Sequence, residues 1–173
     1  PLMSLALTNL SLARAHLERA AELRADNQAL DALYETGRIF QVHRGKFIFT
    51  DALHWLTPNT APDGDRYFLG LDEQGVGYFA INSPFPEGTE NLQTLREAGL
   101  LATEVEIGAA VHAVALANWH DSHTHCARCG AETYSAMGGS IRRCRSDESE
   151  HYPRTDSAVI VLVRDSNNRI LLG

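Results

Sequence analysis

The pattern of apolar and polar residues predicts a helix at the start of the chain. Residues 10–35 are rich in Ala, Leu, Glu and Arg, and their apolar side chains recur at loosely helical spacing. These positions are Leu12, Ala15, Leu23, Leu30 and Leu33. We expect this helix to lie on the surface and to cover one face of a sheet.

The pattern then changes to the alternation typical of β-strands. Residues 38–56 alternate and hold an Arg44-Gly45 pair, which predicts a hairpin turn. Residues 66–81 read as a second hairpin with the sequence DEQG at its turn. Residues 1 to about 85 therefore predict one helix packed on four or five antiparallel strands.

A second helix and a buried strand are predicted further along the chain. Residues 105–120 carry side chains at helical spacing, and we interpret His112 among them as a helix-face residue rather than a ligand. The six consecutive apolar residues 158–163 predict a strand buried on both faces. A turn with the sequence DSNN follows, and RILLG begins another strand.

Pro- and Gly-rich composition makes residues 82–90 the best linker candidate. We therefore divide the chain into four parts. They are an amino-terminal α+β domain (1–88), a helical linker (89–122), a metal-binding hairpin (123–153) and the start of a further domain (154–173). The fold class is α+β.

Composition limits the function classes. The chain has 173 residues, a formal net charge of −7 and a pI of about 5.6, which argues against broad binding to a nucleic-acid backbone. A local basic group remains near Cys144, formed by Arg142, Arg143, Arg145 and Arg154. No apolar run approaches the roughly 18 residues of a membrane span, and we expect neither a membrane partner nor a signal peptide.

The cysteines point to a metal. All three lie within nineteen residues, which favours metal binding over a disulfide framework and predicts a reducing, cytoplasmic location. Cys126 and Cys129 form a C-x2-C knuckle, and Cys144 opens a second one. Residues 137–140 predict the tip of a hairpin between the two knuckles, so the arrangement is that of a zinc ribbon.

The fourth ligand departs from the four-cysteine pattern. Asp147 occupies the position of the missing cysteine, and a carboxylate is an acceptable zinc ligand. His151 is chemically the better ligand but needs a wider loop, and His123, His125 or water are further candidates. A ribbon that keeps its fold with three free thiols is the alternative. We favour a structural zinc held by Cys126, Cys129, Cys144 and Asp147.

Several segments in this order resemble the NADH pyrophosphatase branch of the Nudix hydrolases. They are WHDSHTHCARCG, RRC, HYPRTDSAVIVLV and ILLG, with FLGLDEQGVGYFAI and LREAGLL in the amino-terminal region. The resemblance covers most of the chain. It implies an amino-terminal α/β domain, a zinc ribbon (123–153) and, from residue 154, the first strands of a Nudix α/β/α sandwich.

The resemblance also implies an activity. The family acts as a homodimer and hydrolyses the pyrophosphate of NADH or NAD to nicotinamide mononucleotide and AMP. It uses Mg or Mn, and bacterial members can remove NAD caps from RNA. The aromatic residue before the proline of HYPR corresponds to Tyr152, which in the family packs on a base of the dinucleotide in the partner subunit's pocket. The alternative interpretation, given equal weight, is that Tyr152 has only a structural role and packs between the ribbon and the first Nudix strand.

Two departures shape the functional expectation. The Nudix box, whose glutamates hold the divalent ions, is absent from these residues, and LREAGLL at 95–101 lacks the Glu-Glu pair that should follow. Ser157 also stands where Pro is common in the family. We expect no catalytic residue in this chain and no hydrolysis by it alone. We interpret the chain as part of a longer enzyme.

The alternative is a zinc-ribbon module that binds protein or RNA without catalysis, motivated by the arginines around Cys144. In a third, compatible interpretation, residues 1–153 serve dimerisation and orient Tyr152 across the interface.

Overall fold

A computed structural model describes residue 12, residues 16–156 and residues 161–171. Its centre is a three-stranded sheet in the order β1-β4-β3, formed by β1 (Arg38–Val42), β4 (Gly77–Asn82) and β3 (Asp65–Leu71). β3 and β4 form the expected antiparallel hairpin. β1 runs parallel to β4, so the prediction of purely antiparallel strands is wrong for this pair.

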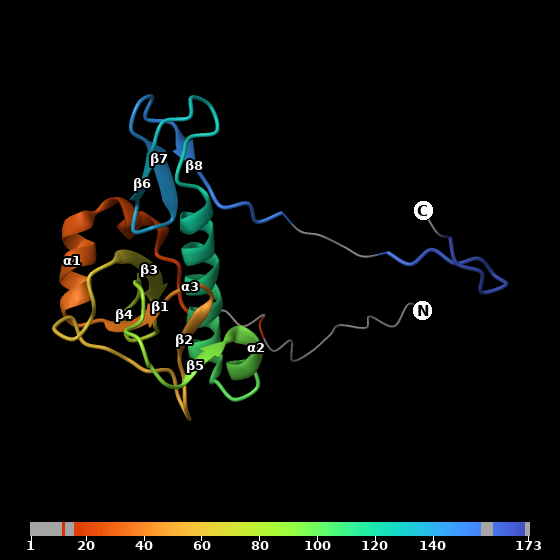
Figure 1. The fold of residues 1–173 in the computed structure, drawn as a ribbon, viewed down its shortest axis with the longest axis horizontal. Helices are drawn as coiled ribbons and strands as arrows, with labels where there is room; N and C mark the ends of the chain where they lie inside the picture. The colour runs from red at the N-terminus through yellow and green to blue at the C-terminus, as the bar shows by residue number, and fades with distance from the viewer. Residues whose placement is uncertain (1–11, 13–15, 157–160, 172–173) are drawn as a thin grey trace.

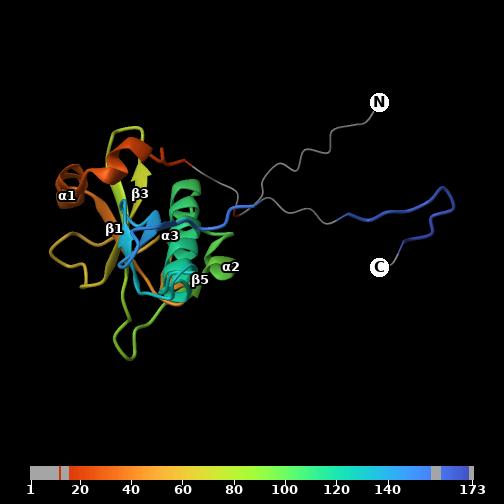
Figure 2. The ribbon, with the colours of Figure 1, turned by 90° about the horizontal axis from the view of Figure 1, so that it is seen from above.

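Helices cover both faces of this sheet, as Figure 2 shows. On one face lies α1 (Asn27–Glu35), which packs Leu30 among Ile39, Phe79 and neighbouring apolar side chains. On the other lies α3 (Glu104–Ser122), whose buried alanines contact a core with Phe40 and Tyr67. Because successive strand residues point to opposite faces, a sheet covered on both sides must be apolar at consecutive positions. The burial of both Ile39 and Phe40 follows from this rule.

The first predicted hairpin has the expected turn, but its two strands do not pair with each other beyond that turn. Arg44 and Gly45 both have positive φ, and His43 pairs with Lys46 across them. Beyond this turn the strands separate, because β2 (Lys46–Ile48) pairs antiparallel with β5 (Leu92–Thr94) in a second sheet. Local turn chemistry was therefore interpreted correctly, whereas the partner of each strand depended on distant residues.

The predicted continuous helix over 10–35 is wrong in its described part. Glu18 instead exchanges two main-chain hydrogen bonds of 2.9 Å with Leu71 at the edge of β3. A short 3-10 helix, η1 (Ala21–Ala25), follows. α1 then begins after Asp26, whose carboxylate accepts a hydrogen bond from the Ala29 N–H as an N-cap.

The second predicted helix is confirmed and is longer than expected. α3 is preceded by α2 (Leu95–Ala98) and begins with a capping box between Thr103 and Glu106. Residues 89–122 are thus helical in large part, and their assignment as a linker between domains stays a prediction. They contribute α2 and α3 to the same core as the central sheet, where α3 packs because it is apolar on most of its surface.

The predicted ribbon hairpin is also confirmed. β6 (Thr133–Ala136) and β7 (Ile141–Cys144) pair antiparallel around a tip at 137–140, and β8 (Glu150–His151) pairs with the outer edge of β7. This small sheet sits at the carboxy-terminal end of α3, above the central sheet in Figure 1.

The last described residues differ from the prediction of a doubly buried strand. Residues 157–160 lie outside the described part, and Val161 is 70% exposed in an extended segment that runs away from the body of the protein (Figure 1). The DSNN turn is present, since Asp165 and Arg169 pair across it. Apolar sequence alone does not bury a strand when, among the described residues, no second layer covers it. No helix in the described part of the chain is long and apolar enough to cross a membrane.

Candidate functional site

The two knuckles of the ribbon have matching main-chain geometry. In the first, the Arg128 N–H lies 3.4 Å from the Cys126 Sγ, and Gly130 leaves the turn with φ 75°. In the second, the Ser146 N–H lies 3.3 Å from the Cys144 Sγ. Each cysteine thus receives an N–H from the residue two positions later, as expected when a reverse turn points ligands at one ion.

This match places Asp147 where a fourth cysteine would stand. It follows Cys144 by three positions, as Cys129 follows Cys126. One ligand atom from each of these four residues lies within 4.8 Å of all the others. A tetrahedral zinc with Zn–S bonds of about 2.3 Å requires sulfurs about 3.8 Å apart. The Cys129 and Cys144 sulfurs are 3.5 Å apart, so the donor set fits zinc.

The other predicted ligands do not join this group in the described part of the chain. The His151 Nε2 lies 3.4 Å from the Ser149 hydroxyl. The ring of His123 contacts the Trp119 carbonyl, and the ring of His125 contacts the Thr124 hydroxyl. The geometry therefore favours Asp147, and its role as a ligand stays a prediction.

Ser149 is not among the site residues predicted from the sequence. Its hydroxyl donates to the Asp147 Oδ1 at 2.6 Å, its N–H donates to the same oxygen at 3.0 Å, and its Oγ lies 3.6 Å from the Cys126 Sγ. The available signal was the D-x-S spacing, because Asp side chains accept hydrogen bonds from the backbone two residues later. Ser149 thus orients the carboxylate toward the cysteines.

Hydrogen bonding sets the ionisation of these groups. The Ser149 hydroxyl, with further bonds from Cys144 and the Ser149 N–H, lowers the pKa of Asp147 to about 2. Burial opposes ionisation of Cys126, but bonds from Ser149 and from main-chain N–H groups lower its pKa to about 6. Burial raises the pKa of Cys144 to about 11. The hydrogen bonds that lower the pKa values of Cys126 and Asp147 therefore favour the ionised forms that metal ligation requires.

A buried polar cluster attaches the ribbon to the central domain. Arg142 donates to the Thr133 hydroxyl and carbonyl, both at 2.7 Å, and to the His120 Nδ1 at 2.8 Å. The other His120 nitrogen, Nε2, donates to the Gly139 carbonyl at 2.8 Å. Since Arg142 must donate, His120 is neutral and carries its proton on Nε2, and burial lowers its pKa accordingly.

The predicted basic group near Cys144 is dispersed by these contacts. Arg142 is buried, and Arg143 pairs with Glu150 at 2.6 Å. The guanidinium of Arg145 lies over the Tyr134 ring, and Arg154 pairs with Asp156. The four arginines do not form one free cationic face, which weakens the argument for RNA binding by the ribbon.

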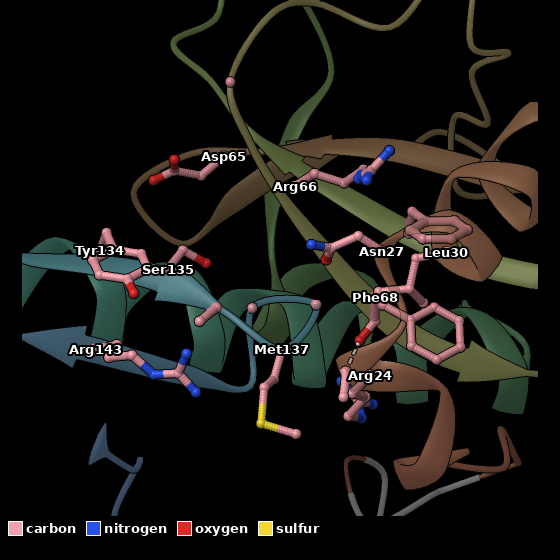
Figure 3. A pocket seen from close by; sticks show the side chains of 16 residues that line it. Arg24, Asn27, Leu30, Asp65, Arg66, Phe68, Tyr134, Ser135, Met137 and Arg143 are labelled. Carbon is pink, nitrogen blue, oxygen red and sulfur yellow. Dashed lines mark hydrogen bonds between the residues drawn. The ribbon is translucent and has the colours of Figure 1, made fainter. Parts of the chain in front are cut away.

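A pocket of about 600 Å³ lies where the ribbon hairpin meets β3 and η1 (Figure 3). Arg24, Arg66 and Arg143 border it, and the dashed line marks the bond from Arg24 to the Phe68 carbonyl. Two of these arginines are neutralised, because Arg66 pairs with Asp31 and Arg143 with Glu150. The pocket also contains the carboxylate of Asp65, so it has little net positive charge to offer an anion.

Tyr152 lies outside both the metal cluster and this pocket. Its ring is 62% exposed, and its hydroxyl donates to Glu150 at 2.5 Å. The side chain borders a second groove, formed by α3 and by arginines from the start of the chain. The ring is therefore available to a ligand, and its substrate contact stays a prediction.

Comparison with known proteins agrees with this geometry. Residues 121–152 match a family model described as the NADH pyrophosphatase zinc ribbon domain. The chain is 28% identical over 175 residues to the NAD-capped RNA hydrolase NudC of Mycobacterium tuberculosis (strain ATCC 25618 / H37Rv), an alignment that covers 94% of this chain and 55% of the relative.

Mammalian relatives agree as well. The chain is 26% identical over 183 residues to the mitochondrial NAD(P)H pyrophosphatase NUDT13 of Homo sapiens, covering 87% of this chain and 52% of that protein. The Mus musculus protein of the same name is 35% identical over 123 residues, covering 62% and 35%. The chain thus spans about half the length of the curated relatives that match most of it.

Proposed function

Because this chain belongs to the NADH pyrophosphatase branch of the Nudix hydrolases, we propose that it serves the cleavage of the pyrophosphate in NADH or NAD. The products would be nicotinamide mononucleotide and AMP. Similarity along 94% of the chain to an NAD-capped RNA hydrolase supports this proposal and extends it to NAD-capped RNA.

Within such an enzyme, these residues would supply scaffold rather than catalysis. No segment of the 173 residues has the glutamate spacing of a Nudix box, so the Mg or Mn ions of the reaction would be held elsewhere. The ribbon would hold a structural zinc through Cys126, Cys129, Cys144 and Asp147. Three free thiols at such a site suit a reducing compartment, and we propose the cytoplasm.

We also propose a homodimer in which Tyr152 contacts the dinucleotide. The support is the exposed aromatic ring, held by its bond to Glu150 and free to stack on a base. The alternative, a zinc-ribbon module without catalysis, loses its main support because Arg142 is buried, Arg143 and Arg154 are paired with carboxylates, and Arg145 lies over the Tyr134 ring.

The activity is tested by comparing two polypeptides. The first is this chain alone, and the second is a chimaera in which the Nudix-box domain of the mycobacterial relative follows residue 173. With NADH and Mg or Mn, we expect the chimaera to release AMP and the chain alone to release none. AMP release by the chain alone would contradict the scaffold role, and a folded but inactive chimaera would contradict the function.

A further inference from the structure

The three cysteines of the ribbon lie close together but differ in their access to solvent. Cys129 is exposed, whereas Cys126 and Cys144 are buried, with 4% and 0% of their surface exposed. The Cys129 and Cys144 sulfurs are 3.5 Å apart, although the two residues stand 15 positions apart in the sequence. An accessible thiol beside a second thiol is typical of redox-sensing cysteines, in which the first is oxidised and the second closes a disulfide.

The fourth donor of the site cannot take part in this chemistry. Asp147 stands beside the three cysteines, and a carboxylate forms no disulfide. Three cysteines can close only one disulfide and must leave one thiol. With Cys129 joined to Cys144, the site would keep only Cys126 and Asp147, and two donors fall short of the four that tetrahedral zinc requires. Oxidation of this pair is therefore incompatible with zinc binding.

The attachment of the ribbon to the central domain does not involve these ligands. The two knuckles form the loops at the end of the ribbon that points away from the central sheet (Figure 1). At the base of the ribbon, the Phe68 N–H donates to the Gly138 carbonyl, and Arg142 donates to His120 of α3. None of these contacts uses a zinc ligand, so we expect the base to stay in place when the knuckles open.

The second knuckle is linked to the segment that follows it. The Cys144 N–H donates to the Ser149 carbonyl at 3.0 Å, and the Ser149 hydroxyl donates to the Asp147 carboxylate at 2.6 Å. β8 begins at the next residue, and Tyr152 follows β8 directly. A change in the second knuckle therefore reaches β8 and Tyr152 without passing through the central domain.

We propose that the ribbon is a peroxide-sensitive switch, in which a disulfide between Cys129 and Cys144 replaces the bound zinc. The oxidised ribbon stays attached at its base, while β8 and Tyr152 lose their fixed position. This inference rests on the proposed zinc site but not on the proposed hydrolysis, since the switch needs no dinucleotide.

The oxidation takes place in two steps and consumes one hydrogen peroxide. In the first, the Cys129 sulfur bonds to one peroxide oxygen, the O–O bond breaks, and the other oxygen leaves as water with a proton from solvent. In the second, the Cys144 sulfur bonds to the Cys129 sulfur, the S–O bond breaks, and the hydroxide leaves as water with a second solvent proton. The two sulfurs lose two electrons and the peroxide gains them. A dithiol reverses the change.

Zinc release is tested on the zinc-loaded chain with hydrogen peroxide and a chromogenic chelator. We expect peroxide to release the zinc as thiols are lost, and dithiothreitol with added zinc to restore the loaded form. A chain that binds no zinc before oxidation would contradict the zinc site itself. A chain that binds zinc and keeps it after peroxide treatment would overturn the switch alone.

Peptide mapping identifies the disulfide, because trypsin places each cysteine in a different peptide. Cys126 falls in residues 97–128, Cys129 in 129–142 and Cys144 in 144–145. Mass spectrometry of the oxidised chain should find 129–142 joined to 144–145, with Cys126 as a free thiol. A disulfide that contains Cys126, or sulfinic acid on Cys129 in place of a disulfide, would overturn the proposal.

Two variants test which thiol the oxidant reaches. Cys129→Ser and Cys126→Ser each remove one zinc ligand, so they differ in the exposure of the missing thiol and not in the number of donors. Because buried cysteines are inert, peroxide should oxidise Cys129→Ser at least about tenfold more slowly than Cys126→Ser. Equal rates would contradict the entry of the oxidant at Cys129.

Hydrogen exchange locates the structural change. After oxidation the Cys144 amide should exchange faster, because its acceptor lies on the opened second knuckle. The Phe68 amide is the control, since its acceptor lies at the base of the ribbon, and its protection should not change. Loss of protection at both amides would show that the whole ribbon detaches and would overturn a switch confined to the knuckles.

Discussion

Substitution of Gly139 tests how firmly the ribbon is attached to the central domain. Gly139 lies at the ribbon tip with φ +85°, and an added Cβ would stand 2.6 Å from the Tyr67 Cδ1. Tyr67 cannot move aside easily, because it is fully buried and stacks on His120 at 4.7 Å between ring centroids. The same tip accepts a 2.8 Å hydrogen bond from the Phe68 N–H through the Gly138 carbonyl.

Two costs add in Gly139→Ala. The left-handed backbone costs an alanine about 1–2 kcal/mol, and forcing a methyl group into a packed site costs about 1–3 kcal/mol. Gly75→Ala is the matched control, because its φ is +79° and nothing lies within 4 Å of the added Cβ. We therefore expect Gly139→Ala to lower the free energy of unfolding by about 1–3 kcal/mol more than Gly75→Ala does.

Urea unfolding of the zinc-loaded variants measures this difference. Hydrogen exchange then locates it: the Phe68 amide should exchange faster in Gly139→Ala than in Gly75→Ala, because its acceptor lies on the displaced tip. Equal destabilisation by the two substitutions, with unchanged protection of Phe68, would refute the close packing of the tip on Tyr67.

Three further predictions address the zinc site, the ribbon cluster and acid stability. In chelator competition, Asp147→Ala should weaken zinc binding about 10–100-fold or more, and Asp147→Cys should strengthen it. His151→Ala should change zinc affinity little. A larger loss of affinity in His151→Ala than in Asp147→Ala would identify His151 as the ligand. Arg142→Ala should lower the free energy of unfolding by about 2–4 kcal/mol, because it leaves His120 and Thr133 unpaired. Arg145→Ala, at an exposed position, should change the free energy of unfolding by no more than about 0.5 kcal/mol. Similar losses in the two variants would contradict the buried cluster. Burial holds the folded pKa of His112 at about 4, below its unfolded value, so the unfolded state binds more protons and stability falls as pH drops from about 6.5 toward 4. His112→Gln should lose less stability over that range, and an unchanged pH dependence would exclude His112 as a source.

The sequence predicted what depends on neighbouring residues. The β3–β4 hairpin, α3 and the ribbon hairpin each follow from a local pattern of turn residues, helical spacing or cysteine spacing. The placement of Asp147 beside the cysteines was accessible for the same reason, because the second knuckle repeats the first at equal spacing.

The predictions that were wrong concern contacts between residues that are distant in the sequence. Nothing local shows that β1 pairs with β4, or that Glu18 pairs with Leu71 instead of continuing a helix. The close approach at Leu71 requires its neighbour Gly70, where an added Cβ would lie 2.2 Å from the Glu18 carbonyl oxygen.

The two ends of α3 fix the length of that helix. Near its start, the Glu106 carboxylate accepts from the Leu53 N–H at 2.9 Å, and near its end His120 holds Arg142 and Gly139. Fourteen positions separate these anchors, which corresponds to about 21 Å and nearly four full turns. One inserted residue would turn one anchor by about 100° relative to the other. The number of residues in α3 therefore sets the orientation of the ribbon, and of Tyr152 after it, relative to the central domain.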